Sequence, residues 1–132
     1  WPHVGANGSR DGQENGDGLL LRSNVRRPRR FRDVTDGASH TLAIGEALPE
    51  LDFWCSWPYA NNAHSTCAIP PNFWPQSKQD RNDAFWPNNL SFRSRHPGGV
   101  HFARVDGSVA LINDQIDIDA YRGMASIAGR EQ

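Results

Sequence analysis

The amino-acid sequence predicts a single α+β domain that is rich in short strands and long loops. Three observations point to this class. The 132 residues include 12 Gly and 9 Pro, and the apolar residues come in short groups rather than in long helical stripes. An alternating run ends at an Asp-Gly pair, which is typical of a β-hairpin. A periodic segment near the C-terminus predicts one short helix.

The hairpin is the clearest element. "VHFARVDGSVALI", residues 100–112, alternates up to Asp106-Gly107, and a two-residue turn there pairs Ala103 with Ala110. Strand alternation then places one set of apolar residues on the core face. The residues of that set are Val100, Phe102, Val109 and Leu111.

Two further segments carry strand patterns. "TLAIGEAL", residues 41–48, predicts a buried strand or a short helix that leads into one, and Leu19–Ser23 predicts a strand. Upstream of the first of these, Asp33 or Thr35 caps a short turn that Gly37 interrupts.

The C-terminal segment predicts the helix. It begins near Asp117 or Asp119 and ends at Gly129, because glycine is typical of the residue that follows a helix. The residues expected to face the core are Ile118, Tyr121 and Ala125.

Two regions lack regular patterning. Residues 1–18 are glycine-rich and predict a flexible lead-in, whereas residues 51–89 form an insert with three Trp-Pro dipeptides. The residue before proline is driven out of the helical region, so helix is disfavoured there. The insert contains Trp54, Trp57, Trp74 and Trp86. These rings either form a small core of their own or present a binding surface to polysaccharide or a partner.

Two cysteines, Cys55 and Cys67, enclose part of this insert. A bridge between them would stabilise the domain by about 3 kcal/mol in the chain-entropy description. Cysteines in a chain this rich in loops favour a disulfide and an oxidising compartment.

Charge and motifs exclude several function classes. The formal net charge is -1, so we expect no nucleic-acid partner. No run of about 20 apolar residues is present to span a membrane. The sequence has no nucleophile elbow, phosphate loop or dinucleotide fingerprint, so we expect no enzyme.

His96 and Asp106 suggest a catalytic pair by their spacing, but strand geometry argues against it. An extended run from Val100 to Val105 separates them by about 17 Å. Pro97-Gly98-Gly99 instead forms the turn before the strand, and Asp106-Gly107 reverses the chain after it. His96 and His101 can ligate a metal if the turn brings them together, although a histidine bonded to nearby backbone is the commoner outcome.

Three blocks of sequence resemble one family. His96, the nine residues after it and Asp106-Gly107 closely resemble the H-x9-DG signature of the prepilin-type proteins grouped as DUF1559. "FRDVTDGASHTLAIGE", residues 31–46, and "IDIDAYRGMASIAGRE", residues 116–131, resemble two further blocks of that family. The motif positions carried over are His96, Pro97, Gly98, Gly99, Asp106, Gly107, Asp33, Asp36, Gly37 and Glu46. "HFARV", residues 101–105, departs from the more apolar strand that the family has there.

The resemblance implies a non-enzymatic structural protein, namely the extracytoplasmic globular head of a pilin-like subunit. It implies a cleaved leader and a long apolar helix before Trp1, through which alone the protein would meet the membrane. Partners would be other pilin-like subunits or a larger envelope assembly. Related pseudopilins carry calcium in their heads, and the candidate ligands here are Asp33, Asp36 and Asp106. The alternative function is a carbohydrate- or partner-binding module built on the tryptophan-rich insert.

Overall fold

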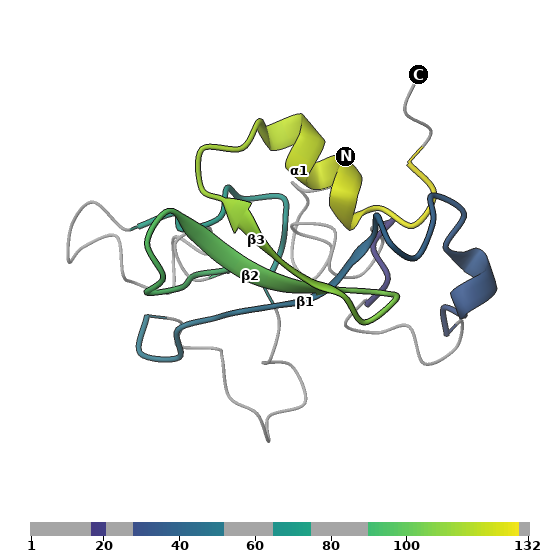
Figure 1. Ribbon diagram of the computed structural model, residues 1–132, viewed down its shortest axis with the longest axis horizontal. Coiled ribbons are helices and arrows are strands. Elements are labelled where there is room, and N and C mark those ends of the chain that lie inside the picture. Colours follow the sequence, from purple (N-terminus) through teal and green to yellow (C-terminus); the bar gives the residue numbers. More distant parts are fainter. Residues whose placement is uncertain (1–16, 21–27, 52–64, 75–89, 130–132) are drawn as a thin grey trace, which may run out of the picture.

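A computed structural model describes residues 17–20, 28–51, 65–74 and 90–129. These residues form a short 3₁₀ helix (Phe31–Asp33), three strands and one α-helix. The strands are β1 (Leu42–Gly45), β2 (Gly99–Arg104) and β3 (Val109–Asn113), and the helix is α1 (Ile118–Ala125). Figure 1 shows α1 above the sheet that the three strands form. The small antiparallel sheet and the single helix confirm the α+β class.

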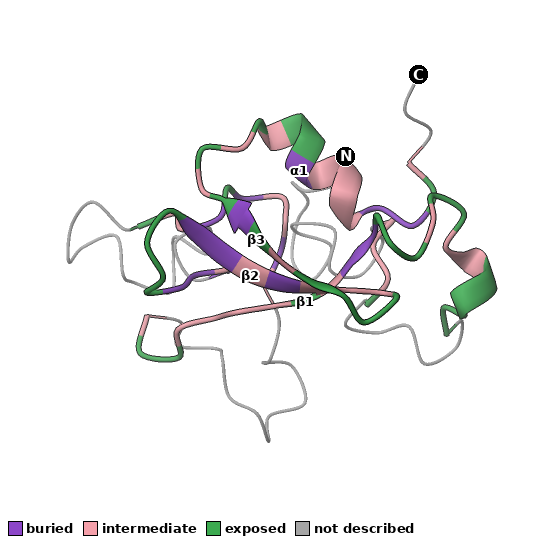
Figure 2. Ribbon diagram, in the orientation of Figure 1, coloured by how far each residue is buried: buried purple, intermediate pink, exposed green. Residues whose placement is uncertain are grey.

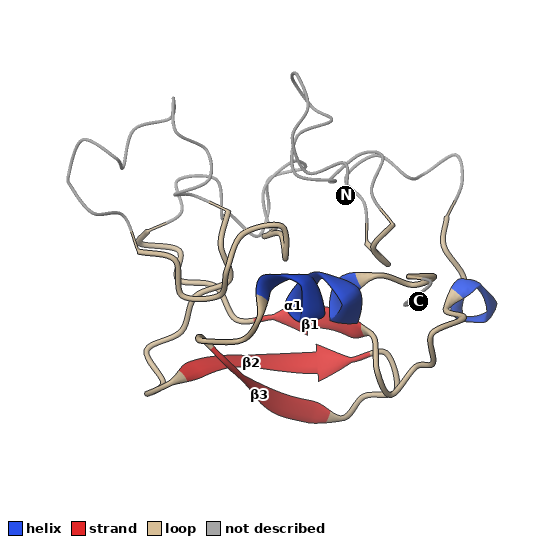
Figure 3. Cartoon of the chain, turned by 90° about the horizontal axis from the view of Figure 1, so that it is seen from above, coloured by secondary structure: helices blue, strands red, loops and turns tan. Residues whose placement is uncertain are grey.

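The sheet has the order β1-β2-β3, and both strand pairs are antiparallel. One face carries the buried core, in which Val100 and Phe102 of β2 are 0% and 1% exposed. Tyr121 of α1 is fully buried against this face, and its ring meets the Phe102 ring edge-on at 5.9 Å between centroids. Burial of each large apolar side chain stabilises the fold by about 2–3 kcal/mol. Figures 2 and 3 show the helix packed over the buried side of the sheet.

The hairpin is present, but its register differs by one residue from the prediction. Ala103 pairs with Val109 rather than with Ala110, because the loop holds three residues, Val105–Gly107. Arg104 N donates to Ser108 O (2.8 Å), and Gly107 N donates to Arg104 O (2.9 Å). Gly107 has φ +85°, as expected for a type I turn that is completed by a left-handed glycine.

The register change reverses the faces of β3, since adjacent residues of a strand point to opposite sides. Ile112 is buried at 6% exposure, whereas Val109 and Leu111 are 67% and 48% exposed. The prediction was therefore right for Val100 and Phe102 and wrong for Val109 and Leu111.

The helix begins where the sequence predicts. Asp117 is the N-cap, and its side chain accepts hydrogen bonds from Asp119 N and Ala120 N. The helix ends at Ala125 rather than at Gly129. Ser126 is already extended and forms an isolated bridge with Gly18, so pairing with another segment ends the helix before Gly129.

Two other predictions concern segments that lie partly or mostly outside the described residues. Leu19 and Leu20 are not in a strand, and the rest of the predicted Leu19–Ser23 strand lies outside those residues. Most of the tryptophan-rich insert also lies outside them. Within the described part of the chain, no helix is both long and apolar enough to span a bilayer.

Candidate functional site

A β-bulge in β1 determines which way Glu46 points. Leu42 pairs with Arg104, but Ile44 pairs with Ala103, so one extra residue is accommodated between them. Bulges re-aim the side chains that follow them. After this one, Gly45 lies opposite Phe102 on the core face, and Glu46 falls on the outer face of the sheet.

Gly45 is required by close packing at this point. A Cβ atom there would overlap the rings of Phe92 and Phe102, which contact each other edge-on with centroids 4.9 Å apart. The glycine thus lets β1 approach β2 closely over the core, and it fixes the position of the next residue, Glu46.

Glu46 and His101 are tied together through backbone and side chain. Glu46 N donates to His101 O (3.2 Å), and His101 N donates to the Glu46 carboxylate oxygen Oε2 (2.8 Å). The same oxygen lies 3.3 Å from His101 Nδ1. The carboxylate is therefore held by the strand that carries the histidine.

His96 reaches the same carboxylate from the turn that precedes β2. Its Nε2 lies 3.3 Å from Glu46 Oε1. Gly98 has φ +79°, and a Cβ at Gly99 would overlap the Ile112 carbonyl of β3. The Pro97-Gly98-Gly99 turn therefore lets the chain pass closely over β3 and brings His96 back toward the sheet.

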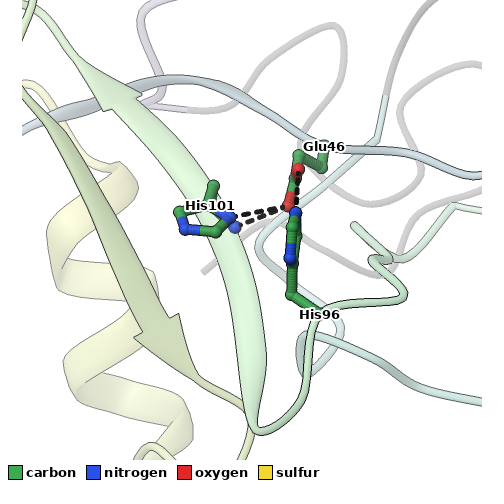
Figure 4. Close-up of side chains that lie close together, drawn as sticks. All are labelled: Glu46, His96 and His101. Atoms are coloured by element: carbon green, nitrogen blue, oxygen red, sulfur yellow. Dashed lines mark hydrogen bonds and ion pairs between the residues drawn. The ribbon is translucent and has the colours of Figure 1, made fainter.

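The three side chains form one compact cluster, hereafter the Glu46–His96–His101 cluster (Figure 4). The two imidazole rings meet edge-on at 90°, with centroids 4.5 Å apart. One ligand atom from each residue lies within 4.8 Å of the other two. The side chains are 36–54% exposed, so the cluster faces solvent.

Electrostatics keep Glu46 ionised. Partial burial alone would raise its pKa, but hydrogen bonds from His101 N and the Ser94 hydroxyl, together with attraction to the two histidines, lower the pKa below its usual value. The Ser94 hydroxyl also accepts a hydrogen bond from His96 N (3.1 Å). This buried serine therefore connects the carboxylate to the segment that carries His96.

Asp106 lies at the other end of β2 from His96, as the strand arithmetic predicts. Its Oδ1 accepts hydrogen bonds from the backbone N (2.9 Å) and the hydroxyl (2.7 Å) of Ser108. These hydrogen bonds lower the pKa of Asp106. Its role is to hold the turn.

The other two aspartates also bond to backbone. Asp33 Oδ2 accepts from Arg30 N (2.8 Å), and Asp36 Oδ2 accepts from Gly129 N (2.6 Å). Gly37 takes φ +98°. Neither carboxylate, nor that of Asp106, belongs to the group of possible metal ligands that the described residues bring together. Calcium binding by these aspartates stays a prediction.

Each member of the cluster is recognisable in the sequence as a motif residue, but the sequence pattern does not place Glu46 beside the histidines. His96 and Glu46 belong to separate motif blocks, and a bulge is needed to turn Glu46 outward. The signal that could have found it is the Gly45-Glu46 pair, since a glycine inside a strand pattern suggests a bulge or a close approach.

Cys67 is one partner of the predicted Cys55–Cys67 disulfide, and it lies beside α1. It has a free thiol in the structure, and Cys55 lies outside the described residues, so the bridge is not confirmed. Burial of the sulfur raises the pKa of the Cys67 thiol to about 12. The same burial raises the pKa of Tyr121.

Of the four tryptophans named as possible binding residues, Trp74 is described and is 43% exposed. Trp54, Trp57 and Trp86 lie outside the described residues. The choice between a small aromatic core and a binding surface therefore stays open.

Comparison with protein families identifies the chain. A family model described as "Protein of unknown function (DUF1559)" matches residues 3–119. The chain belongs to the DUF1559 family. The match includes the whole Glu46–His96–His101 cluster and all three strands, whereas the third motif block, residues 116–131, extends beyond it. No curated protein and no solved structure matches the chain.

Proposed function

We propose that this DUF1559 chain is the extracytoplasmic head of a pilin-like subunit and that it works by assembly rather than by catalysis. The observation that carries the proposal is an exposed row of apolar residues on the outer face of the sheet, on the same face as Glu46 and His101. Ile44, Ala103 and Val109 form a row across the three strands, since Ala103 pairs with both of the others. Ile44 and Val109 are 65% and 67% exposed.

Leu111 extends this row along β3 and is 48% exposed. Single exposed apolar residues are common on soluble proteins, but adjacent ones on one face are typical of an interaction surface. The opposite face of the sheet is covered by α1 and carries the core. A neighbouring pilin-like subunit packed on the outer face would remove these side chains from water.

The test is assembly of the full-length protein, measured as the pelletable fraction and as cross-linked multimers. Val109→Asp places a charge in the row at an exposed position, so we expect assembly to fall about tenfold, or more, with the fold intact. Phe31→Asp is the matched control, because Phe31 is 79% exposed but lies outside the sheet. Equal assembly of wild type and V109D, or full-length protein that forms no multimers, would contradict the proposal.

A second candidate function, polysaccharide binding, is favoured by the exposure of Trp74. A half-exposed indole offers a flat apolar surface that can stack on a sugar ring. Tryptophan fluorescence of wild type should be quenched by soluble glycans, and the part due to Trp74 should disappear in Trp74→Phe. Emission that does not respond to any glycan would remove this candidate.

A further inference from the structure

We infer that the Glu46–His96–His101 cluster binds one first-row transition-metal dication, with Zn²⁺ as the preferred ion. The donor set is two imidazole nitrogens and one carboxylate oxygen. This set suits Zn²⁺ and its neighbours, whereas Ca²⁺ and Mg²⁺ require mainly oxygen ligands. The inference concerns this site alone and does not depend on assembly of the protein.

The spacing of the donor atoms supports coordination. Zinc bonds of about 2.0–2.2 Å at tetrahedral angles place two ligand atoms about 3.3–3.6 Å apart. Glu46 Oε1 lies 3.3 Å from His96 Nε2, and the other carboxylate oxygen, Oε2, lies 3.3 Å from His101 Nδ1. Direct charge-assisted hydrogen bonds are shorter, about 2.7–2.9 Å. The carboxylate is therefore at the separation that two ligands of one ion have.

The ligands are held by backbone before any ion binds. Glu46 and His101 pair across β1 and β2, and His101 N fixes the carboxylate at 2.8 Å. His96 lies just before the turn that precedes β2, and its backbone N donates a hydrogen bond to the Ser94 hydroxyl. Groups that support the ligands in this way strengthen metal sites, because the ligands lose less freedom on binding.

The site has an open side. Three protein ligands leave a fourth tetrahedral position for water or another donor, and the exposed fractions of the three side chains leave that side facing solvent. We therefore expect rapid, reversible exchange of the ion with chelators.

The experiment measures zinc binding to the purified chain by isothermal titration and by the shift in melting temperature. We expect one Zn²⁺ per chain and a higher melting temperature with zinc but not with Ca²⁺, because an ion that binds the native state stabilises it. Glu46→Gln, His96→Gln and His101→Gln should each weaken zinc binding by about tenfold or more, as even loss of a supporting group costs 10- to 100-fold.

Two controls separate this site from other histidines. His40→Gln changes an exposed histidine whose Nδ1 lies 3.3 Å from the Ser39 hydroxyl, outside the cluster, and the double variant H3Q/H64Q removes the two histidines outside the described residues. Both should bind zinc like the wild type. Circular dichroism without metal confirms that each ligand variant is folded.

The inference is overturned by absence of a zinc-dependent shift in the wild type. It is equally overturned if the folded ligand variants bind like the wild type, or if either control weakens binding as much as they do. Multimers formed by a folded protein that does not bind zinc would refute this site and leave the assembly proposal standing.

Discussion

The two ends of β2 are built from the same stretch of sequence but differ in what holds them. At the far end, the Asp106 side chain and Gly107 N form hydrogen bonds to residues no more than three positions away, and the backbone N of Asp106 also donates to Ala38 O (3.1 Å). At the near end, His96 and His101 contact Glu46, which comes from the end of β1, more than 40 residues earlier in the sequence.

The difference shows which features of this chain are local. The reversal at the far end depends on turn chemistry, because Asp-Gly favours a tight turn, and the distant residues that bond to it, Ala38 and Thr41, lie outside the cluster. The near end depends on how β1 is registered against β2, and hence on the bulge and on Gly45. A change at the far end should therefore leave the cluster intact, whereas a change in β1 should disturb it.

The largest effect is expected from Gly45→Ala. Its Cβ would overlap the rings of Phe92 and Phe102, and overpacking of a core costs about 2–3 kcal/mol. Urea unfolding measures the loss of stability, and zinc titration should show weaker binding because β1 shifts. A variant as stable as the wild type would show that the two strands are less closely packed than described.

Gly98→Ala is the matched comparison at the near end. Open space surrounds the position where its Cβ would lie, but φ is +79°, so strain of about 1 kcal/mol is expected without a steric clash. If G98A lost as much stability as G45A, backbone conformation rather than packing would account for the loss in G45A.

Gly107→Ala tests the far end of β2, and its expected loss of stability is similar to that of Gly98→Ala. Its φ of +85° also predicts a loss of about 1 kcal/mol in urea unfolding. Zinc binding should be unchanged, because no hydrogen bond of the turn reaches the cluster. Weaker zinc binding in this variant would show that the two ends are coupled through β2.

The smallest effect is a pH dependence at Asp106. Hydrogen bonds from Ser108 lower its pKa in the folded state, so its contribution is complete above the pKa of the unfolded chain and is lost as pH falls through the folded value. Wild type should therefore lose stability relative to Asp106→Asn below about pH 4. If the difference in stability between wild type and D106N were the same at pH 6 and at pH 3, Asp106 would make no such contribution.

Sequence patterns predicted the parts of the fold that depend on neighbouring residues. The N-cap of α1 and the reversal at Asp106-Gly107 are correct for this reason. The end of α1 was wrong because Ser126 pairs with Gly18, a segment far away in the sequence.

The register of the hairpin was wrong by one residue because Asp-Gly serves both two-residue and three-residue loops. The turn residues alone do not distinguish them. In the candidate site, the histidines were recognised as a possible pair, but the position of Glu46 depends on the bulge that separates Leu42 from Ile44.

That bulge decides which face of the sheet the following residues present, because it offsets the alternation of side chains in β1 by one residue. If β1 kept Ala43 but paired regularly from Leu42 onward, Ile44 would lie opposite Phe102 and Glu46 opposite Val100, both on the core face. The carboxylate would then be buried without a partner, at a cost of several kcal/mol. A strand that lacked Ala43 and paired regularly would instead keep Glu46 opposite His101 on the outer face, so the pairing of β1 and not its residue types alone sets the position of the carboxylate.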